Sequence, residues 1–161
     1  MTKLLCKFSL ICISLLFPLL ICSGCDVSET IDEPVVATET TPEEQSKALQ
    51  AATSFLQKLD ENNFDTWDDV STIIKSGTSR SEWTSLTKTI RTTSGKFIKR
   101  DLSGWTCTEN LPGAAKGRYF VFDHKSTFEK MELIERVVAS LENNKWTIAG
   151  YHTTKEIPQS I

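Results

Sequence analysis

The apolar residues of this chain follow a helical spacing in the middle of the sequence and a strand-like spacing after it. The first helical face, with spacings of four, three and four, consists of Ala48, Ala52, Phe55 and Leu59. Before it, Thr41 is a natural N-cap, Pro42 suits the first helical position, and Glu44 completes a capping box. This pattern predicts a helix from Pro42 to about Asp60.

Two further helices are predicted before residue 96. The segment 64–75 favours a short helix with Asp65 as its cap, and its inward residues are Phe64, Trp67, Val70 and Ile74. Ser79 and Glu82 form a second capping box, and Gly95 suits the position just past the end of the helix that follows. The apolar face of this third helix consists of Trp83, Leu86 and Ile90.

Aromatic and β-branched residues predict four strands in the last part of the chain, at residues 96–107, 118–124, 135–141 and 146–151. We expect the first to bend at Ser103 and Gly104. Asn143 and Asn144 tolerate the left-handed backbone of a tight hairpin turn. Gly150 leaves room for a bulge, a bend or a close neighbour.

Helices first and strands afterwards predict an α+β fold, with N-terminal helices packed on one face of a curved antiparallel sheet of about four strands. Alternation along the second strand puts Tyr119 on one face, with Val121 and Asp123. Phe120, Phe122 and His124 then share the other face. Both faces are partly apolar, so this strand is expected inside the sheet.

Residues 1–24 have the pattern of a secretory signal peptide. Lys3 and Lys7 form a basic start, and the stretch from Phe8 to Cys22 carries no charge. An uncleaved membrane helix is the alternative, although the apolar run is short for a span of about 20 residues and contains Pro18.

The end of this segment, Cys22-Ser23-Gly24-Cys25, resembles a bacterial lipobox. The resemblance implies cleavage between Gly24 and Cys25 and lipidation of Cys25. The sequence departs from the family pattern at Cys22, where leucine is preferred. Acyl chains on Cys25 would hold the protein at a membrane. Asp26 resembles the inner-membrane retention signal of enterobacterial lipoproteins, a rule that varies between bacterial groups, so the choice of inner or outer membrane stays open.

An acidic segment separates the lipidated cysteine from the domain. Within residues 25–41, the segment after Cys25 contains five acidic residues, no basic one and no aromatic one, which is typical of a disordered tether, and it reaches about 50 Å when fully stretched. The predicted domain spans residues 42–155, followed by a tail at 156–161. Without the signal peptide the chain carries 16 basic and 21 acidic residues, a balance that argues against nucleic acid as a partner.

The candidates for chemistry are few. Of the five cysteines only Cys107 would remain, and a small buried hydrophobic role is expected for it. Arg100 and Glu135 predict a structural ion pair across the sheet, with a ligand-anchoring arginine as the alternative. His124 is expected near the surface at a strand end, although a general base on the concave side of the sheet is the other interpretation.

Arg100, Tyr119 and His124 are therefore the candidates for lining a pocket. The two histidines have no recognisable carboxylate pattern beside them, so no metal site and no cofactor is predicted. Trp67, Trp83 and Trp146 are expected in the core. Trp105 breaks the apolar pattern and is expected at the surface or in a pocket.

From Ala48 to Tyr151 the chain resembles the bacterial family known as domain of unknown function 4019. The residues that carry the resemblance are Trp67, Trp83, Gly95, Arg100, Leu111-Pro112-Gly113-Ala114, Gly117-Arg118-Tyr119, Phe128, Glu135 and Trp146-Thr147-Ile148-Ala149-Gly150-Tyr151. The resemblance implies a small exported domain without an established activity. The order of elements also resembles the cystatin-like and nuclear transport factor 2-like cone, an architecture that hosts both enzymes and binding modules.

These observations together predict an exported, membrane-anchored lipoprotein that faces the periplasm and is not an enzyme. Its domain is expected to bind an unknown protein or small ligand. Two alternatives stay open: a small enzyme of the cone type with an acid–base residue in an enclosed pocket, and a structural component of the cell envelope. The second alternative predicts no enclosed pocket and an exposed apolar patch or sheet edge for a partner.

The lipid anchor has a direct test. A Cys25→Ala variant should leave the membrane fraction and lose the mass of its acyl chains, because no residue then remains to carry them. Membrane fractionation and intact-protein mass spectrometry measure both. A variant that stays in the membrane at its unprocessed mass would show that residues 1–24 are a retained anchor.

Overall fold

The structure, a computed structural model, describes residues 39–155. The predicted signal peptide, Cys25, most of the tether and the tail 156–161 lie outside the described residues. The helical elements are α1 (Pro42–Asp60), the 3-10 helix η1 (Trp67–Asp69), α2 (Thr72–Gly77) and α3 (Arg80–Ser94). The strands are β1 (Phe97–Thr108), β2 (Tyr119–Phe128), β3 (Glu132–Glu142) and β4 (Lys145–Lys155).

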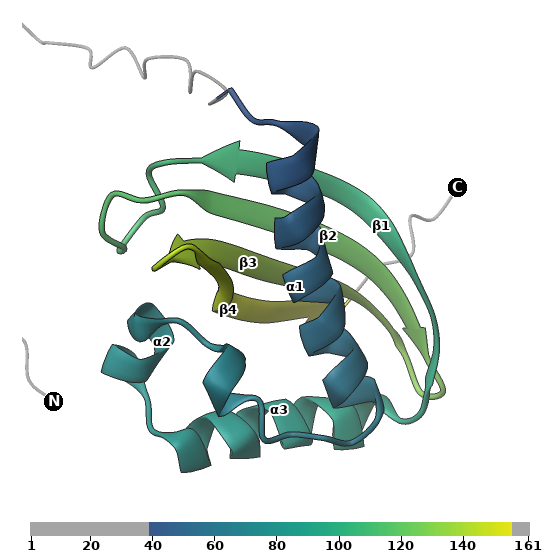
Figure 1. Cartoon of the computed structure of the whole chain (residues 1–161). Helices are drawn as coiled ribbons and strands as arrows, with labels where there is room; N and C mark the ends of the chain where they lie inside the picture. Colours follow the sequence, from purple (N-terminus) through teal and green to yellow (C-terminus); the bar gives the residue numbers. More distant parts are fainter. Residues whose placement is uncertain (1–38, 156–161) are drawn as a thin grey trace, which may run out of the picture. The chain divides into compact units, whose positions relative to one another are not determined.

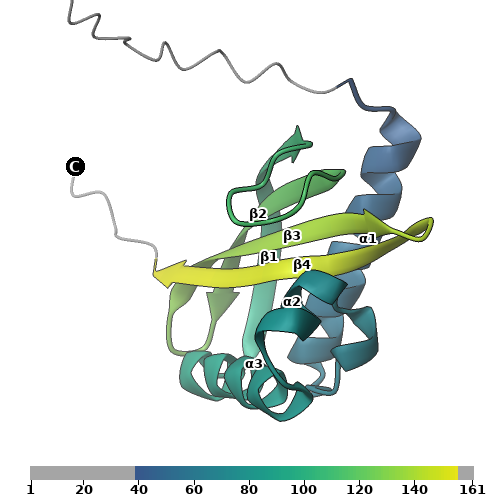
Figure 2. The same cartoon turned by 90° about the vertical axis from the view of Figure 1, so that its left-hand side faces the viewer.

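The four strands form an antiparallel sheet in the order β1-β2-β3-β4 (Figure 1). Helix α1 crosses one face of this curved sheet and α3 runs past one end of it (Figures 1 and 2). Asn143 and Asn144 have φ values of 48° and 64°, so the predicted hairpin turn between β3 and β4 is confirmed. The predicted α+β class, with helices on one face of the sheet, is confirmed as well.

The core lies between α1 and the sheet. The predicted face of α1 is buried, together with Leu56 one residue after Phe55. From the sheet, Phe120, Phe122 and Val137 meet it with no exposed surface. Burying large apolar side chains from both layers supplies the main favourable free energy of this packing. We call the sheet face under the helices the concave face, and the opposite one the open face.

The predicted helix over 64–75 is wrong, because the chain breaks at Val70. Val70 is extended, with a ψ of 150°, and forms a parallel bridge with Ile148 of β4. The next amide, that of Ser71, donates a 2.9 Å hydrogen bond to the Ile148 carbonyl. Pairing with β4 therefore replaces helical hydrogen bonds at this point. Asp65 caps no helix here and instead pairs with Arg80.

Helix α3 has the predicted ends but a different buried face. The capping box of Ser79 and Glu82 is present, and Gly95 ends the helix with a φ of 83°. Trp83 is buried, but Leu86 is 48% exposed. The buried residues that continue the face are Thr87, Arg91 and Ser94. The apolar stripe through Leu86 was thus a wrong prediction, since this helix buries polar side chains against the sheet.

Other local predictions hold in part. The Thr41 hydroxyl accepts from the Glu44 amide at 3.2 Å, but the Glu44 carboxylate binds Arg118 and leaves the capping box incomplete. Strand β1 shifts register between Leu102 and Gly104, at the predicted bend. Strand β4 shifts register beside Gly150, where a side chain would meet Val138 at 3.3 Å.

Candidate functional site

Four charged side chains meet inside the domain, and we call them the four-charge cluster: Asp60, Arg91, Arg100 and Glu135. The Glu135 carboxylate lies 2.8 Å from Arg91 Nη1 and 2.6 Å from Arg100 Nη2. The Asp60 carboxylate lies 3.1 Å from Arg91 Nη2 and 2.7 Å from Arg100 Nη1. Each acid therefore contacts both arginines, and the two negative charges balance the two positive ones.

The cluster joins the helices to the sheet. Asp60 is the last residue of α1 and Arg91 lies in α3, whereas Arg100 and Glu135 lie on β1 and β3. The Glu135 side chain has no exposed surface, and the Arg91 side chain is 4% exposed. A buried charge is costly unless it is paired and hydrogen-bonded. The folded arrangement of these four elements is what makes the pairing possible.

Neighbouring groups complete the cluster. The Tyr151 hydroxyl donates to Glu135 Oε1 at 2.6 Å, and Arg91 Nη1 donates to the Tyr151 oxygen at 2.9 Å. Arg100 Nε donates to the Ser126 hydroxyl at 3.0 Å. Each guanidinium also lies over an aromatic ring, that of Arg91 at 4.9 Å from the centre of Phe128 and that of Arg100 at 4.5 Å from Phe97.

The arginines set the protonation of the cluster. Burial alone would raise the pKa of Glu135, but the charges of Arg91 and Arg100 lower this pKa from 4.5 to about 2. Burial and the adjacent Glu135 carboxylate raise the pKa of Tyr151 above its usual value of 10. Glu135 is therefore an anion and Tyr151 a neutral hydrogen-bond donor at neutral pH. Neither is poised to exchange a proton there.

His124 lies beside the cluster on the concave face. It pairs with Glu135 across the sheet and is 4% exposed, so the predicted surface position was wrong. The reason is that β2 continues to Phe128, which places His124 in the middle of the strand. Burial and the charge of Arg100 lower the pKa of His124 below 6.5, against the opposing effects of Glu135 and Asp123. The histidine is thus held neutral, and its Nδ1 has no hydrogen-bond partner among the described residues.

The three predicted pocket residues do not come together. Arg100 and His124 lie on the concave face, and the predicted ion pair between Arg100 and Glu135 is confirmed. It spans β2, since β1 and β3 are not neighbours in the sheet. Tyr119 lies on the other face, where its hydroxyl donates to the Ala115 carbonyl at 2.7 Å. Sequence reasoning missed Asp60, Arg91 and Tyr151.

Solvent reaches the cluster only at its edge. A hollow lined by Asp60, Arg91, Lys96 and Phe97, among others, lies between the ends of α1 and α3. Glu135 and His124 are not among its lining residues. Arg91 Nε and Nη2 are fully buried and form no hydrogen bond of good geometry within residues 39–155. Of the groups in and beside the cluster, the Glu135 carboxylate and the His124 imidazole therefore do not face this hollow, whereas Asp60 and Arg91 do.

The remaining predicted residues divide between interior and surface. Trp83 is buried and its indole N–H donates to Thr66 at 2.9 Å, whereas Trp67 and Trp146 pack against the core while partly exposed. Cys107 is buried, as expected, and burial raises the pKa of its thiol. Trp105 is 42% exposed at the surface.

Strand β1 carries most of the exposed large hydrophobic residues of the described chain. In the described part of the chain, three of five exposed large hydrophobic residues lie on it: Ile98, Leu102 and Trp105. We call these three residues the β1 apolar row. Leu102 pairs with His124 and Trp105 with Phe122, so both lie on the concave face beyond the cover of the helices. The row lies at the sheet edge, because β1 has β2 as its single neighbour in the described sheet.

Two kinds of site are not found within residues 39–155. No group of three or more histidine, cysteine, aspartate or glutamate side chains there is arranged to hold a metal ion. No helix in this region has the length and apolar character needed to cross a membrane.

Removing the charge of Glu135 should destabilise the domain strongly. A Glu135→Gln variant leaves two buried arginines facing one acid, and breaking a buried pair costs about 3–5 kcal/mol of unfolding free energy. Urea unfolding followed by circular dichroism measures the loss. The matched control is Asp123→Asn, which breaks a pair with Arg136 on the open face, where Arg136 is 55% exposed. Its expected cost is below about 1 kcal/mol, so equal losses in both variants would contradict this account.

Stability should fall in two stages as the pH drops. The unfolded chain protonates His124 near 6.5 and Glu135 near 4.5, whereas folding lowers the pKa of both. The unfolded state then binds more protons, so the unfolding free energy decreases below pH 6.5 and again from pH 4.5 to about 2. Urea midpoints across this range measure it. A His124→Gln variant should lose the decrease in stability below pH 6.5, and a His152→Gln variant should retain it. The reverse result would show that His124 does not cause this decrease.

Comparison with known proteins gives one family. No curated protein and no solved structure matches this chain. A family model matches residues 51–151, which is more than half of the chain and includes all four residues of the four-charge cluster. The family is described as "Protein of unknown function (DUF4019)". The resemblance to domain of unknown function 4019 is thus confirmed, and the chain belongs to this family.

Proposed function

We propose that this protein is an exported, lipid-anchored envelope protein whose domain binds another protein and catalyses no reaction. The resemblance of Cys22–Cys25 to a lipobox supports the anchor, and the acidic segment after it supports a domain held away from the membrane. The observation that carries the binding role is the β1 apolar row, in which Ile98 is 61% exposed and Leu102 and Trp105 are each 42% exposed.

The row has the character of a protein contact. Tryptophan is enriched at the energetic centres of interfaces, where it buries a large area at low entropic cost. Trp105 is held in place by Phe120, with ring centres 5.9 Å apart. Leu102 lies on the same face and extends the apolar surface. The partner is therefore expected to present an apolar patch to these side chains.

Side chains rather than the strand backbone should make this contact. Strand β1 has irregular register at Ile98 and again at Ser103, and Arg100 between them points inward to the cluster. Bulges and inward charges are the features that protect sheet edges from pairing with another strand. Continuous extension of the sheet by a partner strand is thus disfavoured.

The absence of catalysis is supported by the state of the interior. Glu135, Tyr151 and the two arginines of the four-charge cluster are engaged with one another. His124 is held neutral under the helices and is not among the residues that line the hollow beside the cluster. The enzyme alternative would require a path from solvent to this histidine.

Photo-crosslinking tests the proposed contact. A photoreactive phenylalanine derivative placed at Trp105 should give an adduct with a distinct protein in intact cells, and the same group at Lys88 on the exposed face of α3 should not. Mass spectrometry of the adduct identifies the partner. An adduct with a second copy of this chain would assign self-association instead, and no adduct at Trp105, or equal adducts at both positions, would contradict the proposal.

A further inference from the structure

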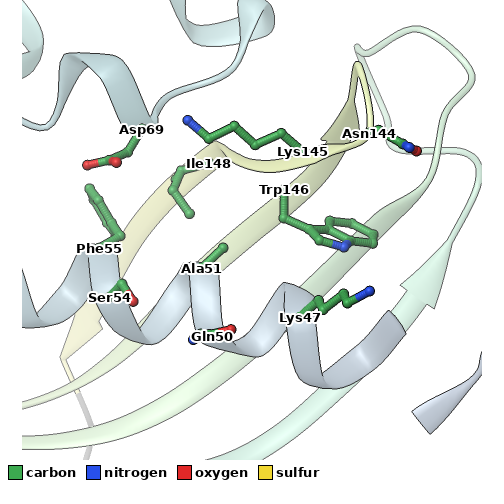
Figure 3. Close-up of a pocket in the computed structure, with 10 residues that line it drawn as sticks. All are labelled: Lys47, Gln50, Ala51, Ser54, Phe55, Asp69, Asn144, Lys145, Trp146 and Ile148. Atoms are coloured by element: carbon green, nitrogen blue, oxygen red, sulfur yellow. The ribbon is translucent and has the colours of Figure 1, made fainter. Parts of the chain in front are cut away.

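A groove runs between α1 and the hairpin of β3 and β4, away from the β1 apolar row. Its helical wall consists of Lys47, Gln50 and Ser54, three residues spaced along one side of α1. Its other wall is formed by the turn and the start of β4, from which the Trp146 indole extends toward Lys47 (Figure 3). The hollow has a volume of about 390 Å³, within the range of small-molecule sites.

The floor of the groove is apolar. Phe55 lines it from α1 and Ile148 from β4, and Ala51 lies between the polar residues of the helical wall (Figure 3). The small side chain of Ala51 lets a ligand approach the helix closely. Trp146 packs edge-on against Phe120, with ring centres 5.3 Å apart, so its indole is held in position. An apolar floor with a few polar groups at its rim is the usual composition of a ligand site.

The polar groups at the rim are not engaged within the described chain. Over residues 39–155 the side chains of Gln50, Ser54 and Asn144 form no hydrogen bond, Lys145 forms no ion pair, and the Trp146 indole N–H has no acceptor. The other charges at the groove are paired, Lys47 with Glu43 at 2.7 Å and Asp69 with Lys58 at 2.7 Å. The groove is therefore nearly neutral and rich in free donors and acceptors.

We propose that this groove binds a saccharide. A sugar ring presents hydroxyl groups that both donate and accept, as the amides of Gln50 and Asn144 and the hydroxyl of Ser54 do. It also presents a face of C–H groups, which suits an indole that combines an apolar body with one N–H donor. The low net charge of the groove does not select a strongly anionic ligand. This activity goes beyond the protein contact proposed for β1.

The groove extends past the indole. A second hollow beside it is lined by Thr41, Glu43 and Leu141 and shares Lys47, Asn144 and Trp146 with the first. The indole therefore stands between two adjoining hollows. This arrangement suits an oligosaccharide with successive rings on either side of Trp146 better than a single free sugar.

An extended peptide fits the groove less well. The backbone of β4 at Ile148 is already used, because its carbonyl accepts from the Ser71 amide and Val70 bridges it. A peptide strand would lack the main-chain hydrogen bonds that give such complexes their affinity. An amphipathic helix would require a wide apolar groove, and here the helical wall is polar.

Titration of the full-length protein with oligosaccharides tests this proposal. The protein is kept in a zwitterionic detergent without sugar headgroups, and chitotetraose, maltotetraose and cellotetraose are the probes, with a hexaglutamate peptide as the competing class. Isothermal titration calorimetry measures the affinity. Loss of one neutral hydrogen-bonding side chain should weaken binding about five-fold.

The variants can be matched within the chain. Asn144→Gly removes an amide at the groove while keeping a residue that tolerates its φ of 64°, and Asn143→Gly does the same in the same turn at a position that does not line the groove. Gln50→Ala has Gln57→Ala as its control on α1, outside the groove. Trp146→Phe retains a ring against Phe120 but removes the indole donor.

At least one tetrasaccharide should bind, and Asn144→Gly, Gln50→Ala and Trp146→Phe should each weaken it while both controls do not. The proposal is overturned if no tetrasaccharide binds at concentrations up to about 10 mM, because a dissociation constant above this value is too weak for a specific site. It is also overturned if the control variants weaken binding equally. Binding of hexaglutamate in place of the sugars would assign the groove to acidic peptides instead. None of these outcomes depends on crosslinking at Trp105, so the two proposals fail separately.

Discussion

Burial of Glu135 is the constraint on which the rest of this domain depends. A carboxylate with no exposed surface is stable only with full electrostatic compensation, and Arg91 and Arg100 supply it. Arg91 joins α3 to the sheet, and Arg100 joins β1 to β3 across the intervening strand β2. Asp60 then balances the second positive charge and ties down the end of α1. The positions of α1 and α3 are thus fixed by one set of ion pairs as well as by apolar packing.

The same constraint divides the domain into a closed interior and an open periphery. The charged side chains of the cluster pair with one another. Their charges and burial keep Glu135 ionised and His124 neutral. The exposed apolar row lies on β1, before and after Arg100 along the strand, and the groove lies between α1 and the β3–β4 turn. The domain therefore presents two separate surfaces outside its buried charge cluster, one for each of the two proposed binding roles.

Sequence patterns predicted where helices and turns lie better than they predicted which side chains of a helix are buried. Regular features such as the Ala48–Leu59 stripe, the Ser79 capping box and the Asn143-Asn144 turn depend on local chemistry, and all three are present. The break at Val70 depends on pairing with Ile148, 78 positions away in the chain, and no local signal marks it. Helix α3 buries Arg91 in place of Leu86 because its partners lie on α1 and β3. A helix face that contains an arginine is recognisable as interior only once the acidic partners of that arginine are known. For this reason the sequence did not predict that Asp60, Arg91 and Tyr151 join the pair of Arg100 and Glu135.

The central claim is that the interior is closed to solvent, and chemical modification of the two histidines of this chain tests it most directly. Diethylpyrocarbonate reacts with neutral imidazole that solvent can reach. In the folded full-length protein it should modify His152, which is exposed at β4, and should leave His124 unmodified until the protein is denatured. Peptide mapping by mass spectrometry distinguishes the two sites. Modification of His124 in the folded protein at a rate close to that of His152 would show an open acid–base site beside Glu135 and would contradict the account.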